Sequence, residues 1–176
     1  DETFIGNPIP SFYGGLNISA NYKNFDLTLF LNGSYGQKTF NFLKYFIDFP
    51  AFQGNYSTKM LYEAGKTLPV LDNNDNYSPS RSTMYVENSS WTRLRNFQIG
   101  YTLPSNVASR LGMDKLRVYV QGQNLFTFTK YSGLDPDVTI TNITEGFTAR
   151  RDLSLGVDNG KYPWFRSFIF GVNIGL

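Results

Sequence analysis

The stretch WTRLRNFQIGYTLPSNVASRLGMDKLRVYVQGQNLFTFTKY, Trp91–Tyr131, carries the clearest structural signal in the chain. It holds two runs, Phe97–Leu103 and Leu116–Phe128, in which apolar and polar residues alternate. Because successive side chains of a β-strand point to opposite faces, each run predicts a strand with one apolar face and one polar face. The compact connector between the runs favours an antiparallel pair.

Three other stretches of the chain carry the same alternation. Two of them flank a tight turn at Lys23-Asn24 and predict a β-hairpin. The third ends the sequence, where every second residue from Phe168 to Leu176 is apolar. The chain is therefore predicted to be all-β, with about five antiparallel strands. These strands are expected at about 14–22, 25–35, 91–103, 116–128 and 165–176.

The connections between the predicted strands alternate between short and long. The turn at Lys23-Asn24 and the connector 104–115 are short, whereas 36–90 and 130–162 are long. Barrels of the bacterial outer membrane have short turns on the periplasmic side and long loops outside. This alternation favours a membrane barrel in which 36–90 and 130–162 are extracellular loops.

Short helices are expected inside two of these connections. Asn106–Leu111 follows a capping residue, Ser105, and precedes Gly112, which would end the helix. A second short helix is expected over Ser57–Gly65.

The composition agrees with a sheet that meets lipid. Aromatic residues make up 17% of the chain, with 16 Phe and 12 Tyr, and charged residues make up a further 17%. Lipid-facing sheets carry aromatic girdles and few charges. A soluble carbohydrate-binding β-sandwich stays open as the alternative, because its strands also have one apolar and one polar face.

Charged residues test the membrane hypothesis along the predicted strands. None lies on the apolar face at the centre of a run. Arg93 and Arg95 share the parity of Phe97, which assigns them to the apolar face. They lie near the outer end of their strand, where we expect lipid phosphate or the loops to accept them.

The composition also excludes several kinds of chemistry. The chain has no Cys and no His, which removes thiol chemistry, a Ser-His-Asp triad and the commonest metal ligand. A net charge of +2 gives no basic surface for nucleic acid. Asp135 and Asp137 flank Pro136, which favours a turn over a cation site. We therefore expect no enzyme activity, no catalytic residue, no cofactor and no metal site.

Five strands do not complete a barrel of useful size. An open sheet in lipid leaves the backbone groups of its edges unpaired, with no water to satisfy them. Complete bacterial barrels also have an even number of strands. We expect further strands from another chain or from another segment of the same protein.

Several sequence motifs resemble one family of membrane proteins. They are IGNPIP (5–10) with YKNFDL (22–27), LRNFQIGYTLP (94–104), LRVYVQGQNLFTFT (116–129) with GLDPD (133–137), and YPWFRSFIFGVNI (162–174). In this order they resemble the C-terminal part of SusC-like (RagA-type) TonB-dependent outer-membrane transporters of Bacteroidota. The third motif is the most specific.

The resemblance implies a 22-stranded transmembrane barrel with an N-terminal plug, of which this chain supplies the last five strands and not the plug. It implies a place in the cell outer membrane, surrounded by lipid, with the C-terminus in the periplasm. The implied partners are the rest of the barrel, a SusD-like surface lipoprotein, and TonB, which would act through the plug. The implied activity is nutrient uptake, with an oligosaccharide or a peptide as the substrate.

Substrate contacts are expected in two places. Polar side chains of the strands would offer hydrogen bonds to the lumen, and tyrosines of the long loops would stack on sugar rings or peptide side chains. The alternative for each residue is that it lines the wall or covers a core without touching substrate. The candidate residues are Tyr45, Tyr56, Gln98, Tyr119, Gln121 and Tyr131.

Overall fold

The computed structural model describes residues 4–48, 57–66, 82–138 and 155–175. These residues form two compact units, which we name by their content. The sheet unit comprises Phe12–Ser34, Trp91–Thr129 and Trp164–Leu176, and the loop unit comprises Asp1–Ser11, Tyr35–Ser90 and Lys130–Pro163. The two long connections predicted from the sequence therefore fall in one unit, and the predicted strands fall in the other.

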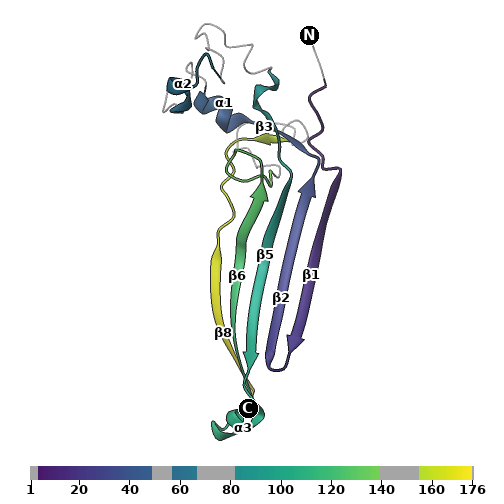
Figure 1. Cartoon of the computed structure of the whole chain (residues 1–176), viewed down its shortest axis with the longest axis vertical. Coiled ribbons are helices and arrows are strands. Elements are labelled where there is room, and N and C mark those ends of the chain that lie inside the picture. Colours follow the sequence, from purple (N-terminus) through teal and green to yellow (C-terminus); the bar gives the residue numbers. More distant parts are fainter. Residues whose placement is uncertain (1–3, 49–56, 67–81, 139–154, 176) are drawn as a thin grey trace, which may run out of the picture. The chain divides into compact units, whose positions relative to one another are not determined.

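The sheet unit is a five-stranded sheet in which neighbouring strands run in opposite directions (Figure 1). All five strands predicted from the sequence are present, and their ends differ from the predicted ones by up to two residues. The strand order is β1-β2-β5-β6-β8. The strands are β1 (Phe12–Tyr22), β2 (Phe25–Tyr35), β5 (Trp91–Thr102), β6 (Lys115–Thr129) and β8 (Ser167–Gly175).

A β-bulge at Arg95 shifts the register inside the sheet. Phe30 of β2 lies opposite Asn96 of β5. The next residue of β2, Leu31, lies opposite Leu94, so the register skips Arg95. Residues directly opposite each other share a face, which places Leu94 on the apolar face and Asn96 on the polar face. The alternation of β5 therefore changes parity at the bulge.

The bulge corrects the predicted place of Arg93. Its parity with Phe97 assigned it to the apolar face, but Arg93 lies opposite Asn32 on β2 and Thr127 on β6. Both partners belong to the polar face. The prediction was wrong because it assumed unbroken alternation along β5, and one extra residue reverses the faces of everything beyond it.

The apolar face of the sheet unit is uncovered. Its side chains are exposed over all five strands; Phe168, for example, is 66% exposed and Phe170 is 76% exposed. No second layer covers this face within the described residues of the sheet unit. A soluble sandwich would bury such a face against another sheet, so the structure favours the membrane alternative. Further exposed members of this face are Phe12, Leu16, Ile18, Tyr22, Phe25, Ile99, Val118, Val120, Phe126, Phe128, Val172 and Ile174.

Short connections close one end of the sheet. β1 and β2 meet in a turn in which Lys23 has a φ of 53°, and α3 (Ser105–Arg110) joins β5 to β6. Pro104 occupies the N-cap position, so Ser105 is the first residue of the helix and not its cap as predicted. Gly112 follows the helix with a φ of 73°, as expected of a residue that ends it.

The loop unit has secondary structure of its own. β3 (Lys38–Asn41) pairs antiparallel with β4 (Val86–Asn88) and parallel with β7 (Val157–Asp158). This small sheet joins the connection 36–90 to the connection 130–162. Within the described residues, the helices of the loop unit are α1 (Phe42–Asp48), α2 (Lys59–Tyr62) and the 3-10 helix η2 (Thr83–Tyr85). α2 lies within the predicted range 57–65 but is shorter. None of the helices in the described residues is long and apolar enough to cross a membrane.

Candidate functional site

The polar face of the sheet unit is a wall of amides and hydroxyls. Thr28, Gln98 and Gln121 lie directly opposite one another on β2, β5 and β6. One row further along, the Ser167 hydroxyl lies 3.2 Å from Oε1 of Gln123, to which it donates a hydrogen bond. The predicted residues Gln98 and Gln121 are thus brought side by side, and both are partly exposed.

One ion pair spans three strands on this face. Nε of Arg117 donates to Oδ1 of Asp26 at 2.9 Å, and Nη2 donates to Oδ2 at 2.5 Å. Arg117 is on β6 and Asp26 is on β2, so the pair passes over β5 at Gly100, which lies opposite Asp26. A Cβ at position 100 would lie 2.5 Å from both side chains. The pair therefore depends on a glycine at this position.

Tyr119 is already engaged by its neighbours. It lies opposite Gly171 of β8, and its ring occupies the space that a side chain at position 171 would need. The guanidinium of Arg117 lies 5.0 Å from the centre of the same ring, in cation–π geometry. An aromatic ring laid over a cross-strand glycine stabilises a sheet. Tyr119 thus has a structural role on the wall.

Arg93 is the most deeply placed charge of the polar face. Its side chain is 1% exposed, its Nε donates to Oγ1 of Thr127 at 2.8 Å, and its guanidinium lies 5.0 Å from the ring centre of Trp91. Burial of an arginine requires such partners. Arg93 was not among the predicted site residues, because the sequence alternation placed it on the other face.

The core of the loop unit is aromatic. Tyr45 of α1 is 5% exposed and Tyr85 is fully buried, and their ring centres lie 5.4 Å apart in an edge-to-face arrangement. Phe40 packs against both rings. Burial, with the nearby charge of Asp48 and the Tyr45 hydroxyl, raises the pKa of Tyr85 to about 12. Tyr45 was predicted to meet substrate, but its ring is part of this core and is not offered at the surface.

Glu87 connects the two long connections. Its carboxylate accepts hydrogen bonds from the Ser132 amide at 2.9 Å, from the Ser132 hydroxyl at 2.7 Å and from Nζ of Lys44 at 3.2 Å. Burial raises the pKa of Glu87, but the hydrogen bonds from Ser132 and the charge of Lys44 outweigh burial and lower it overall. The carboxylate is thus held ionised, as an anchor between β4 and the segment after β6.

Tyr131 makes a buried hydrogen bond within the long connection 130–162. It is 6% exposed, and its hydroxyl donates to Oδ2 of Asp158 at 2.6 Å. Burial and this hydrogen bond raise the pKa of Tyr131 far above its usual value. Oδ1 of Asp158 accepts from the amides of Gly160 and Lys161. The ring of Tyr131 is therefore buried like that of Tyr45, and the remaining predicted tyrosine, Tyr56, lies outside the described residues.

Asp135 and Asp137 form a turn. The amide of Asp137 donates to Oδ1 of Asp135 at 2.9 Å, as in an Asx-turn. Among the described residues, no group of three or more acidic side chains is placed to hold a metal ion. The geometry agrees with the turn that the sequence favoured.

No protein-family model matches the chain. The chain is similar to curated proteins over 99% of its length. It is 34% identical over 179 residues to TonB-dependent receptor P3 of Formosa agariphila, of which it covers 17%. It is 27% identical over 184 residues to TonB-dependent receptor SusC of Bacteroides thetaiotaomicron, of which it covers 16%. The chain thus spans about a sixth of the length of the curated relatives it matches.

The chain is also similar to solved structures of transporters. The RagAB peptide importer in its open-open state matches with a TM-score of 0.68 and 26% identity, over 96% of this chain and 17% of that one. The closed-closed state of the same importer matches with a TM-score of 0.70 and 25% identity, over 96% of this chain and 18% of that one.

Proposed function

Since this chain is homologous to part of the SusC-like, RagA-type TonB-dependent receptors, we propose that it supplies five strands of the barrel of an outer-membrane nutrient importer. The observation that carries the proposal is the pair of opposite faces of the sheet unit. The apolar face is exposed and the opposite face is lined with amides and hydroxyls. A barrel in lipid turns the first face outward and the second toward its lumen.

The proposed orientation follows from the connections. The turn at Lys23-Asn24 and the α3 connector lie at one end of the strands (Figure 1), and short turns belong on the periplasmic side. The loop unit contains both long connections, and because long loops belong on the outer side of such barrels, an extracellular position of the loop unit is proposed. In this orientation β8 ends in the periplasm.

The loop unit is the part proposed to meet a partner. A SusD-like surface lipoprotein is the expected partner, and the solved relative is itself named as a complex, RagAB. The contact of Glu87 with Ser132 and the pairing of β3 with β7 hold the two connections together, so the partner would meet one folded surface and not two independent loops. Energy from TonB would reach the importer through a plug in another part of the protein.

The proposed substrate is an oligosaccharide or a peptide. The name of the solved relative, a peptide importer, supports the second. The wall of neutral amides and hydroxyls suits either class, because both offer hydrogen-bond donors and acceptors. Transport needs no bond to be made or broken, and the relatives named above are receptors and importers.

Uptake by the complete protein tests this proposal with a matched pair of variants. Gln121→Trp places a large ring on the polar face, and Val120→Trp places it on the apolar face of the same strand. We expect Gln121→Trp to reduce uptake of labelled oligosaccharides or peptides, whereas Val120→Trp leaves it unchanged. Surface labelling would confirm equal amounts of both variants.

Equal uptake by the two variants would contradict a lumen on the side of Gln121. Growth on oligosaccharides alone and on peptides alone, with and without the gene, separates the two substrate classes. Normal growth of the deletion strain on both would contradict nutrient import.

A further inference from the structure

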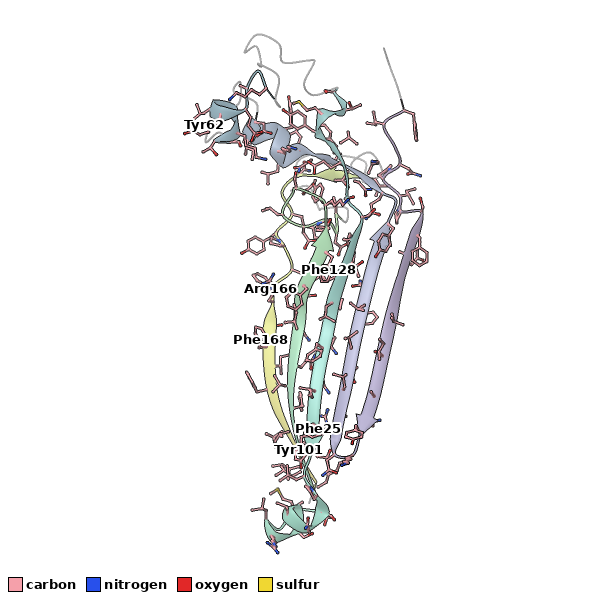
Figure 2. The ribbon with its side chains drawn as sticks, in the orientation of Figure 1. Phe25, Tyr62, Tyr101, Phe128, Arg166 and Phe168 are labelled. Carbon is pink, nitrogen blue, oxygen red and sulfur yellow. The ribbon has the colours of Figure 1, made fainter. Side chains whose placement is uncertain are left out.

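An exposed arginine continues the apolar face of β8. Arg166 immediately precedes β8 and is two residues from Phe168, so the two side chains share a side of an extended chain. Figure 2 shows Arg166 and Phe168 next to each other at the beginning of the strand. Beyond Phe168 this side continues with Phe170, Val172 and Ile174, all exposed. Arg166 therefore lies where the apolar surface ends.

A second guanidinium lies close by, on an indole ring. The guanidinium of Arg95, at the bulge of β5, lies 4.9 Å from the ring centre of Trp164. Trp164 is 47% exposed and Phe165 is 72% exposed. The beginning of β8 thus carries exposed aromatic rings flanked by two arginines, a combination typical of the boundary between hydrocarbon and headgroups.

The acidic residues of the sheet unit are unevenly distributed along its strands. The sequence of this unit contains two acidic residues, Asp26 and Asp114, and both lie at the end that carries the short connections. Arg95 and Arg166 lie at the opposite end, where Arg93 is buried on the polar face. Within the part of the chain that the structure describes, Arg166 makes no ion pair. The apolar face of β8 therefore ends beside the exposed Arg166, with no acidic group of its own sheet at that end.

We propose that Arg166, together with Arg95 and Trp164, binds the phosphate of a lipid A molecule in the outer leaflet. Arginine forms bidentate hydrogen bonds with phosphate, the indole suits the headgroup level, and the apolar column below would meet the acyl chains. The proposal rests on the proposed orientation, in which this end of the strands faces the outer leaflet.

Native mass spectrometry of the complete protein in detergent tests the proposal. The delipidated protein is titrated with lipid A, with the same lipid after phosphate removal, and with phosphatidylglycerol. We expect Arg166→Gln to weaken lipid A binding about five-fold, the effect of removing one basic residue at a membrane surface. Arg110→Gln is the matched control, because Arg110 is an exposed arginine of α3 at the opposite end.

Each outcome supports or overturns the proposal. Weaker lipid A binding by Arg166→Gln alone, together with poor binding of the dephosphorylated lipid, supports it. Equal binding by wild type and Arg166→Gln overturns it, as does wild-type protein that binds phosphatidylglycerol as well as lipid A. Uptake of labelled oligosaccharides or peptides by wild type and by Arg166→Gln is measured in parallel. Normal uptake by both proteins, with equal lipid A binding, would contradict the lipid site and leave nutrient import standing. Absence of uptake by wild type would contradict nutrient import itself.

Discussion

At the scale of single residues, Gly100 shows how one missing side chain organises the polar face. It is buried beneath the Asp26–Arg117 ion pair, which crosses from β2 to β6 above it. The two charges are paired with each other, because each carboxylate oxygen of Asp26 accepts from a nitrogen of the same guanidinium. Such bidentate pairs are the strongest of the exposed ion pairs.

Gly100→Ala is expected to destabilise the complete barrel by about 1–3 kcal/mol, as overpacking does elsewhere. The added methyl group would lie 2.5 Å from Asp26 and Arg117 and would force the pair apart. The measurement is the temperature at which the folded form disappears on electrophoresis after heating. Gly175→Ala is the control, because its new methyl group would be in ordinary contact, 3.4 Å from Lys115. An equal shift in both variants would refute a special role for Gly100.

Glu87 makes the loop unit sensitive to acid. Its folded-state pKa lies below the ordinary value of 4.5, so its contribution to stability is complete above about pH 4.5 and is lost as pH falls through the folded value. Asp48 acts in the opposite direction: burial raises its pKa, and protonation removes the cost of its charge. The carboxylate of Glu87 accepts hydrogen bonds from Asn41, Lys44 and Ser132, so Glu87 is the larger anchor.

Glu87→Gln is expected to destabilise the loop unit at neutral pH by on the order of 2 kcal/mol, because charged hydrogen bonds to Ser132 and Lys44 are lost. The measurement is hydrogen exchange of the Ser132 amide at pH 7 and pH 4, corrected for the intrinsic rate. Protection in wild type should fall toward the variant at pH 4. Asp114→Asn, a carboxylate change in the sheet unit, should alter nothing. If the Ser132 amide of Glu87→Gln were as protected from exchange as that of wild type, Glu87 would not stabilise the loop unit.

At the scale of elements, the bulge in β5 decides which side chains face the lumen. The opposing strand adapts through Asn124, whose φ of 51° is a conformation that asparagine tolerates. The bulge moves Arg93 onto the polar face and Leu94 onto the apolar face. Bulges commonly sit near barrel rims, and this one also positions Arg95 against Trp164.

Cysteine labelling tests the bulge directly, because the natural chain has no Cys. Positions 94 and 96 have the same parity, so unbroken alternation would expose both to the same solvent. With the bulge, Asn96→Cys should react with a water-soluble maleimide and Leu94→Cys should not. Thr127→Cys is a positive control on the polar face and Phe128→Cys a negative one. Equal labelling at 94 and 96 would exclude the bulge.

At the scale of the whole molecule, the sheet has two ends that need neighbours. β1 and β8 lie at the ends of the strand order, and each pairs on one side within the described residues. In lipid an unpaired strand edge is costly, because no water satisfies its amides and carbonyls. A membrane barrel therefore requires further strands beside β1 and beside β8.

The 176-residue chain produced alone is expected to fail to form a stable monomer. Joined to the rest of its protein, it should yield a detergent-soluble barrel whose electrophoretic mobility changes on heating. Sedimentation and electrophoresis of the two forms make the comparison. A chain that stays soluble and monomeric without detergent would contradict the membrane barrel and favour the soluble β-sandwich.

The strands and, between bulges, the faces of their side chains can be predicted from the amino-acid sequence. Period-two alternation is a local property, so Phe97–Leu103 and Leu116–Phe128 predicted strands that the structure confirms. The same alternation brought Gln98 and Gln121 to one face, as the pairing shows.

Contacts between residues distant in sequence could not be predicted, because they depend on how the whole chain folds. Glu87 contacts Ser132, which lies 45 positions away in the sequence, and no local sequence pattern predicts such a contact. The burial of Tyr45 and Tyr131 likewise follows from packing between segments, so tyrosines predicted as binding rings are part of the interior. The face of Arg93 depends on a bulge that is visible in the pairing of β5 with its neighbours. Alternation in the sequence indicates to which face of a strand a side chain points. The residues that this side chain contacts depend on segments that are distant in sequence.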